Sequence, residues 1–456
     1  MSENSITRRQ FITTAGAAAL SLPFLRAGGA LAAGERPNFV FILTDDQRHD
    51  AMSCAGHPFL RTPNIDRIAR EGARFRNAFV TTALCSPSRA SFLTGRYVHS
   101  HGVKDNKTPL PHDITTFPQV LQKAGYDTAY VGKWHMDGQE GPRPGFAHWV
   151  SFKGQGDYTN PRLNINGKVE QVSGYMTDLL TKHAVEWLER SRTTPFCLYL
   201  AHKAVHGPFK PAVRHQKLYE DVDIKRPKSG SDDLTGKPQW MRKRQETAHG
   251  RMEDDKFEQF VKNYNRTLVA VDEGVGRVLQ TLEKTGQLDN TVIVFAGDNG
   301  YFQGEHNLLD KRAMYEESIR IPLVMRYPKL VRPGSLIDQM VLNIDICPTL
   351  LDIAGERSPE GVQGRSLVPL LSGKTRGWRS DFLYEYFEET PYVTPTIKGV
   401  RTQRWKYIEY PEVQETAELY DLETDPEELV NRIGDKWCSG VLADMRKRLE
   451  RLEKET

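Results

Sequence analysis

Residues 38–47 read NFVFILTDDQ, an apolar run that ends in two aspartates. Residues 291–299 read TVIVFAGDN and have the same form. Short apolar runs of this kind are typical of strands that are buried on both faces of a parallel sheet. In open α/β sheets, ligands bind just beyond the carboxyl ends of such strands. The two runs therefore predict strands whose acidic ends face a ligand site.

Apolar runs alternate with helical patterns along most of the chain. Further strands are predicted at residues 128–131, 196–201 and 322–325, and helices at residues 64–72 and 117–125. An apolar stripe at spacings of three and four predicts a longer helix; it consists of Leu268, Val271, Val275, Val278 and Leu282. This alternation predicts an α/β fold with a large, mostly parallel sheet sandwiched by helices.

The length of 456 residues suits one large domain and one smaller domain. We predict a signal peptide over residues 1–33, a catalytic α/β domain over residues 34–375 and a small C-terminal α+β domain over residues 376–456. The last segment holds strand-like runs at residues 382–387, 399–401 and 405–410, followed by an amphipathic helix over residues 442–452. Residues 225–256 are rich in charge, glycine and proline, which predicts a surface insertion in the catalytic domain.

The N-terminal segment has the composition of an export signal. Arg8 and Arg9 precede a mildly apolar run over residues 15–25 and a small-residue site at residues 30–32. Paired arginines in this position indicate the twin-arginine route, which predicts a periplasmic or secreted protein. The apolar run is shorter than the ~20 residues that cross a bilayer, and no other segment is predicted to span a membrane.

Charge and cysteine content narrow the function classes. Lys and Arg number 62 against 59 Asp and Glu, a formal net charge of +3, so no nucleic-acid partner is expected. The five cysteines are Cys54, Cys85, Cys197, Cys347 and Cys438. Their wide spacing fits neither a CxxC metal motif nor a disulfide framework.

Polar side chains follow four of the predicted strands. They are Asp45 and Asp46, Lys133 and His135, His206, and Asp298 and Asn299. Taken singly, each has an ordinary explanation as a helix cap, a turn residue or a structural histidine. Together they predict a cluster at one edge of the sheet. Three carboxylates and one amide at one point need a cation, and an all-oxygen set favours Ca²⁺, with Mg²⁺ or Mn²⁺ as alternatives.

Residues 85–96 read CSPSRASFLTGR and predict a helix. Pro87 suits the first helical position, with Ser86 as the cap and Gly95 near the end. Cys85 then lies at a helix N-terminus, where free N–H groups favour anions, and Arg89 rises on the same face. Cys85 is either a structural cysteine before a helix or a thiolate nucleophile with a lowered pKa.

The pattern Cys-x-Pro-x-Arg followed by Ala-Ser-x-Leu-Thr-Gly-Arg resembles the signature of the type I sulfatases, within the alkaline-phosphatase superfamily. It is accompanied, in that family's order, by the DDQ and GDNG strand ends, Gly132-Lys133-Trp134-His135, Gly304-Glu305-His306 and Lys311-Arg312. The resemblance covers about residues 36–430. The tract from Phe146 to Asp178 resembles sulfatases of the N-acetylglucosamine-6-sulfatase type.

The resemblance implies that a formylglycine-generating or anaerobic maturase converts Cys85 to formylglycine (3-oxoalanine). Hydration gives a gem-diol, in which one hydroxyl attacks sulfur and the other later expels sulfate; serine has no second hydroxyl for this step. The resemblance also implies a role for each site residue. The cation is bound by Asp45, Asp46, Asp298, Asn299 and residue 85. Arg89 stabilises the gem-diolate, Lys133 contacts the gem-diolate and the sulfate, and His135 takes the proton of the second hydroxyl. His206 and Lys311 bind the sulfate, and His206 also protonates the leaving alcohol.

We therefore predict hydrolysis of sulfate monoesters of a small molecule or carbohydrate. The alternatives are a phosphonate or phosphate monoester hydrolase of the same superfamily and a sulfoglycan-binding protein whose Cys85 stays unmodified. The 225–256 segment contains several basic residues, which either bind acidic groups of a sulfated sugar or are simply exposed to solvent. They are Arg226, Lys228, Lys237, Arg242, Lys243 and Arg244. No pattern indicates an oligomeric state.

Overall fold

A computed structural model describes residues 36–136 and 141–456. The predicted signal peptide, with its paired arginines, lies outside the described residues. Among the residues that are described, no helix combines the length and apolar character needed to cross a membrane.

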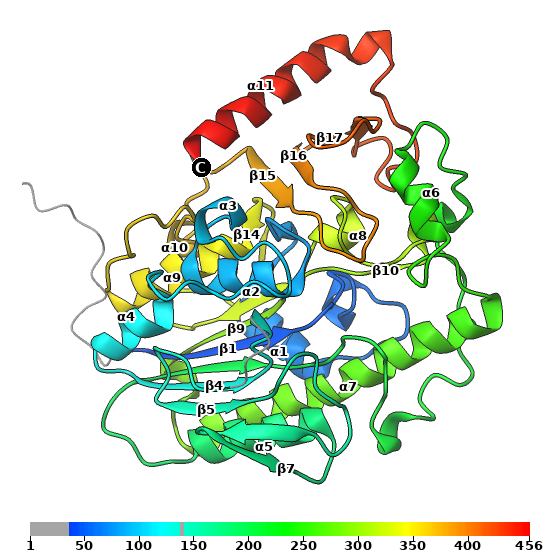
Figure 1. The fold of residues 1–456 in the computed structure, drawn as a ribbon. Coiled ribbons are helices and arrows are strands. Elements are labelled where there is room, and N and C mark those ends of the chain that lie inside the picture. The colour runs from blue at the N-terminus through cyan, green and yellow to red at the C-terminus, as the bar shows by residue number, and fades with distance from the viewer. Residues whose placement is uncertain (1–35, 137–140) are drawn as a thin grey trace, which may run out of the picture. The chain divides into compact units, whose positions relative to one another are not determined.

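The central sheet is built around β1 (Asn38–Thr44), as Figure 1 shows. This strand lies between β9 (Thr291–Gly297) and β8 (Phe196–Ala201) and pairs parallel with both. β4 (Asp127–Gly132) continues the parallel set beside β8. Thr44 is in register with Gly297, so the residues that follow β1 and β9 leave the sheet at the same level. The predicted strands and the mostly parallel sheet are confirmed.

Within the described residues the sheet has ten strands, in the order β13-β2-β12-β9-β1-β8-β4-β5-β6-β7. The outer strands are β2 (Ala73–Phe75), β12 (Leu323–Arg326), β13 (Ser335–Ile337), β5 (His148–Ser151), β6 (Arg162–Ile165) and β7 (Lys168–Gln171). β12 pairs antiparallel with both β9 and β2, so the sheet is mixed at that side. Two short ladders join β3 (Ala78–Phe79) to β14 (Val341–Leu342) and β10 (Phe302–Gln303) to β11 (Leu309–Asp310).

Helices cover both faces of the sheet because successive side chains of each strand point to opposite sides. Phe39, Phe41 and Leu43 of β1 pack into one core, whereas Val40 and Ile42 pack into the other. The first face carries α2 (Cys85–Thr94), α4 (Phe117–Lys123) and α9 (Ile346–Ala354), and the second carries α1 (Pro63–Glu71), α5 (Met176–Leu188) and α7 (Asp254–Lys284) (Figure 1). Shorter helices are α3 (Val98–His101), α6 (Gln239–Gln245), α8 (Glu316–Ile319) and α10 (Val368–Leu371).

The C-terminal region forms an antiparallel sheet of its own. Its strands are β15 (Asp381–Tyr386), β16 (Ile397–Thr402), β17 (Trp405–Glu409) and β18 (Glu418–Asp421). α11 (Ser439–Glu455) buries Met445, Leu449 and Leu452 in the same core as this sheet. Phe382 packs on Phe79 with ring centroids 5.0 Å apart, so the core continues into the large sheet region.

The prediction of a surface insertion at residues 225–256 is wrong for part of this segment. Leu234, Trp240 and Met241 are buried. Trp240, from α6, packs against Tyr410 with ring centroids 6.2 Å apart. These few apolar residues show no sequence periodicity because they lie on the short helix α6 and an irregular loop that cover the C-terminal sheet.

The glycine at the end of β4 provides a test of how closely the strands approach. Gly132 has φ 130°, and a Cβ there would lie 1.7 Å from the carbonyl oxygen of Ala201. We expect Gly132→Ala to lower the free energy of unfolding by about 3 kcal/mol, from left-handed strain and overpacking. Denaturant titration measures this. Gly125→Ala is the control, since φ is 88° but a Cβ there meets open space among the described residues; equal losses would contradict the close approach.

Candidate active site

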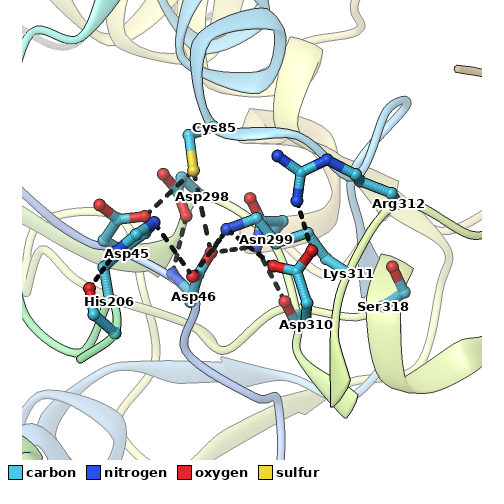
Figure 2. A network of polar contacts seen from close by, with 12 residues as sticks. Asp45, Asp46, Cys85, His206, Asp298, Asn299, Asp310, Lys311, Arg312 and Ser318 are labelled. Carbon is cyan, nitrogen blue, oxygen red and sulfur yellow. Dashed lines mark hydrogen bonds and ion pairs between the residues drawn. The ribbon is translucent and has the colours of Figure 1, made fainter. Parts of the chain in front are cut away.

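The ends of β1 and β9 bring three carboxylates to one buried point. Asp45 and Asp46 follow β1, and Asp298 follows β9. The backbone N–H of Asp46 donates to Asp298 Oδ1 at 3.0 Å, which ties the two strand ends together. One ligand atom from each of Asp45, Asp46, Cys85 and Asp298 lies within 4.8 Å of the others (Figure 2). The predicted convergence at the sheet edge is present in the structure.

Cys85 is the first residue of α2, and extended Leu84 is its N-cap. The prediction that Ser86 caps the helix is wrong: the helix already begins at Cys85, so Ser86 lies inside it, and its Oγ lies 3.1 Å from His135 Nδ1. The helix ends before Gly95, which has φ 69°, as predicted. All ten residues of α2 are buried, so the helix holds the cysteine rigidly within the protein.

The Cys85 thiol points at the acidic cluster. Its Sγ donates to Asp45 Oδ1 at 3.3 Å and lies 3.8 Å from Asp46 Oδ1. Burial raises the pKa of the Cys85 thiol well above its ordinary value, and the negative charge of Asp45 raises it further. A thiolate nucleophile requires the opposite shift, so this shift does not support the hypothesis of a thiolate with a lowered pKa.

Three cations surround the carboxylates. Arg89 donates from Nε to Asp298 Oδ2 at 2.9 Å and from Nη1 to the carbonyl of Lys133 at 2.6 Å. Lys133 forms an ion pair with Asp45, and Lys311 Nζ donates to both carboxylate oxygens of Asp46, at 2.6 and 2.7 Å. Each side chain comes from a different element, so the fold itself assembles this charge balance.

Burial and charge act in opposite directions on the carboxylates. Burial alone would raise the pKa of Asp45, but the charges of Lys133, Arg89 and Lys311 outweigh it and hold that pKa well below its ordinary value. Burial raises the pKa of Asp298 to about 7, and the charge of Asp45 adds to the effect. The positive side chains therefore offset the negative charge of Asp45 more than that of Asp298. Additional positive charge, such as that of a cation, would stabilise the ionised carboxylates.

The cluster fits a hard divalent cation. Asn299 donates from Nδ2 to Asp46 Oδ1 at 2.7 Å and to the carbonyl of Gly300 at 2.8 Å. Its Oδ1 is buried and has no hydrogen-bond partner within residues 36–136 and 141–456. An acceptor in this situation, beside three carboxylates, provides the oxygen ligands that Ca²⁺ and Mg²⁺ prefer.

Two histidines flank the cluster, as predicted. His206 Nε2 lies 3.8 Å from Asp46 Oδ2, and its Nδ1 is 2.7 Å from the carbonyl of Gly207. His135 Nδ1 lies 3.1 Å from Ser86 Oγ. Burial lowers the pKa of both histidines well below the ordinary value, and the charge of Lys133 lowers it further, so both are neutral.

Sequence reasoning missed two residues of the site. Gln155 accepts from Lys133 Nζ at 2.6 Å and lies 3.0 Å from His135 Nε2. Lys203 is buried, with its ammonium 4.7 Å from the ring centroid of Tyr158. Burial and the charge of Lys133 lower the pKa of Lys203 to about 8. The rule applied to the other strand ends would have found Lys203, which follows β8, but not Gln155, because the short strand β5 that precedes it was not predicted from the sequence.

Comparison with known proteins agrees with the fold and the site. A family model described as Sulfatase matches residues 37–356, and one described as N-sulphoglucosamine sulphohydrolase, C-terminal, matches residues 304–455. The chain is 35% identical to N-acetylglucosamine-6-O-sulfatase of Bacteroides thetaiotaomicron, over 92% of this chain and 87% of the relative. It is 32% identical to N-acetylglucosamine-6-sulfatase of Homo sapiens, over 88% of this chain and 82% of the relative.

Solved structures with a similar fold include sulfatases. One of them, a complex with its substrate D-glucosamine-2-N,6-O-disulfate, superposes with a TM-score of 0.87 and 35% identity, over 92% of this chain and 98% of that one. Fold and site together define a hydrolase of the alkaline-phosphatase superfamily. Within it, the chain belongs to the sulfatase family and is a sulfuric ester hydrolase. That family generally uses formylglycine and a divalent metal ion.

We expect ion removal to destabilise the protein, because three buried carboxylates then repel one another. Chelation should lower the melting temperature, and Ca²⁺ at 100 times its Kd should restore about 2.7 kcal/mol of stability. Asp298→Ala should abolish this response, whereas Asp338→Ala, at an exposed carboxylate paired with Arg76, should keep it. Scanning calorimetry and elemental analysis measure both quantities. A calcium response that survives in Asp298→Ala would contradict the assignment.

Proposed function

We propose that this sulfatase hydrolyses a sulfate monoester of a sulfated carbohydrate, with a 6-O-sulfated glucosamine as the first candidate. The observation that carries the proposal is the buried Cys85 Sγ at the start of α2, directed at Asp45 and Asp46 and surrounded by cations. The names of the two relatives and the ligand of the similar complex support the sugar and the position of the sulfate.

The proposed nucleophile is formylglycine at position 85, made from Cys85 by a formylglycine-generating or anaerobic maturase. When hydrated, this group supplies one hydroxyl for attack on sulfur and a second whose deprotonation expels sulfate. The raised thiol pKa supports this proposal, because the unmodified thiol is a poor nucleophile at this position. Arg89, four residues on, is proposed to stabilise negative charge at residue 85.

Asp45, Asp46, Asp298 and Asn299 are the proposed ligands of the cation, with residue 85 completing the set. We propose Ca²⁺, with Mg²⁺ or Mn²⁺ as alternatives, because every proposed protein ligand is an oxygen, including that of residue 85 in its formylglycine form. When bound, the cation offsets the carboxylate charge and so admits an anionic substrate.

The remaining residues are proposed to move protons and bind sulfate. Neutral His135 is suited to take a proton from residue 85. Lys133 and Lys311 present ammonium groups to the sulfate. An arriving sulfate carries negative charge that favours the protonated form of His206. Because the pKa of His206 is low, that form then gives its proton readily to the leaving alcohol.

The basic residues of the 225–256 segment are not all available to substrate. Lys237 is buried and donates to the Tyr420 hydroxyl at 2.8 Å, and Arg244 is buried and donates to the carbonyl of Leu309 at 2.7 Å. Arg226 is paired with Asp254 at 2.6 Å. Lys237 and Arg244 are therefore not available to the sugar, because each is used in packing. For Arg226, whose partner Asp254 is exposed, the alternatives of sugar and solvent stay open.

Export through the twin-arginine route and a periplasmic or secreted location remain proposals from the leader sequence. The division into a catalytic domain over residues 34–375 and a C-terminal domain over residues 376–456 is likewise our proposal. The separate antiparallel sheet from β15 to β18 supports it.

We expect Cys85→Ser to abolish sulfate release while leaving the melting temperature unchanged, because a serine sulfate has no neighbouring hydroxyl to expel it. Active wild-type protein should carry a hydrazide-reactive aldehyde on the peptide containing residue 85, detected by mass spectrometry. Cys438→Ser removes another free thiol and should keep full activity. Turnover by protein whose Cys85 is unmodified would refute the proposal.

The substrate is tested with matched esters. We expect kcat/KM to be at least about tenfold higher on N-acetylglucosamine 6-sulfate than on 4-nitrophenyl sulfate, since ground-state and transition-state contacts to the sugar add to those of the sulfate. N-acetylglucosamine 6-phosphate should be the poorest of the three. Faster phosphate release would favour the phosphate or phosphonate hydrolase, and binding without turnover in aldehyde-bearing protein would favour a sulfoglycan-binding protein.

A further inference from the structure

Gln155 is the only side chain, within the part of the chain that the structure describes, that hydrogen-bonds both Lys133 and His135. It lies on the segment that follows β5, between Gly154 and Gly156, which have φ values of 59° and 62°. Its amide lies 2.6 Å from Lys133 Nζ through Oε1 and 3.0 Å from His135 Nε2 through Nε2. Its side chain is half-buried, so the contact is made from the edge of the site rather than from the core.

The chemistry of the two partners fixes the orientation of the amide. The ammonium of Lys133 has only donors, so the Gln155 atom that faces it must be the acceptor, Oε1. The amide nitrogen therefore faces His135 and can only donate. His135 Nε2 must then be an acceptor without a proton. In the neutral imidazole the proton is consequently on Nδ1, where Ser86 Oγ, 3.1 Å away, is its acceptor.

The position of the His135 ring is defined by its surroundings, through an unusual backbone conformation and two side-chain contacts. Its φ is 68°, a left-handed conformation that few residues other than glycine adopt, and its side chain is 6% exposed. With Ser86 on one ring nitrogen and Gln155 on the other, the imidazole has both contacts defined. Ser86 is the neighbour of the nucleophile position on α2, so the ring is placed relative to residue 85.

We infer that Gln155 is a positioning residue, which selects the Nδ1–H tautomer of His135 and holds Lys133 against Asp45. It acts through these two side chains and has no step of its own in the reaction. The inference rests on the proposed function, in which His135 and Lys133 serve residue 85. A glutamate at this position would reverse the pattern, because a carboxylate accepts on both oxygens and requires a proton on His135 Nε2.

The test compares Gln155→Leu, Gln155→Glu and the control Asp157→Asn, which changes an exposed residue of the same segment. All are assayed on one sulfate ester that wild type turns over, with rates divided by the aldehyde content of each preparation. We expect kcat of Gln155→Leu to fall about 10- to 100-fold with little change in KM, as for residues that orient a catalytic group. Asp157→Asn should stay within about twofold of wild type. Melting temperatures should not change.

Gln155→Glu separates positioning from packing, because it keeps the shape of the side chain while it replaces the amide donor with an acceptor and adds a negative charge. We expect it to lose kcat as Gln155→Leu does, and ¹⁵N shifts of the His135 ring should show the proton on Nε2 instead of Nδ1. Wild-type kcat in either Gln155 variant, or an equal loss in Asp157→Asn, would overturn the inference. Failure of the proposed function is distinguishable, since it would appear as inactivity of wild-type protein that carries the aldehyde.

Discussion

The burial of three carboxylates within one small volume is the constraint that the rest of the structure satisfies. Asp45 and Asp298 are fully buried, and Asp46 is 1% exposed. Desolvated like charges at this separation are costly unless positive charge is supplied from several directions. Arg89 from α2 and Lys133 from the end of β4 provide part of it. The parallel sheet and the buried helix α2 are the scaffold that fixes these charges, and the chemistry of a sulfuric ester hydrolase uses the same charges.

The central strands could be predicted from the sequence because each is buried on both faces. Such strands appear as uninterrupted apolar runs, and residues 38–44 and 196–201 are strands with the predicted limits. β18 could not be predicted in this way, since residues 418–421 have charged residues at both ends of a two-residue apolar pair. Trp240 and Met241 were missed for a related reason: their burial depends on distant chain segments that cover them, which no local pattern encodes.

The convergence of the proposed metal ligands on Cys85 could be predicted, because the aspartates follow predicted strands and Cys85 lies in a motif within one stretch of sequence. Asp298, for example, can be placed at the site once the strand that precedes it has been predicted. Gln155 could not be predicted in the same way, because its strand is short and its meaning depends on Lys133 and His135 from another strand. The N-cap was also misjudged: Ser86 suits a cap by residue type, but the helix begins one residue earlier and Ser86 Oγ contacts His135 Nδ1 from a distant segment. Such local details depend on contacts with residues that are distant in the sequence.

The complete burial of α2 has a consequence for the order of events in the life of the chain. In the folded protein, no residue of α2 is exposed to solvent, so another enzyme could not bind Cys85 and its neighbours there. The maturase proposed above would therefore have to bind this stretch while it is still extended, during or soon after synthesis. Under that proposal, a chain that folds before it is modified would keep its thiol, so the yield of active protein would depend on whether modification or folding is faster.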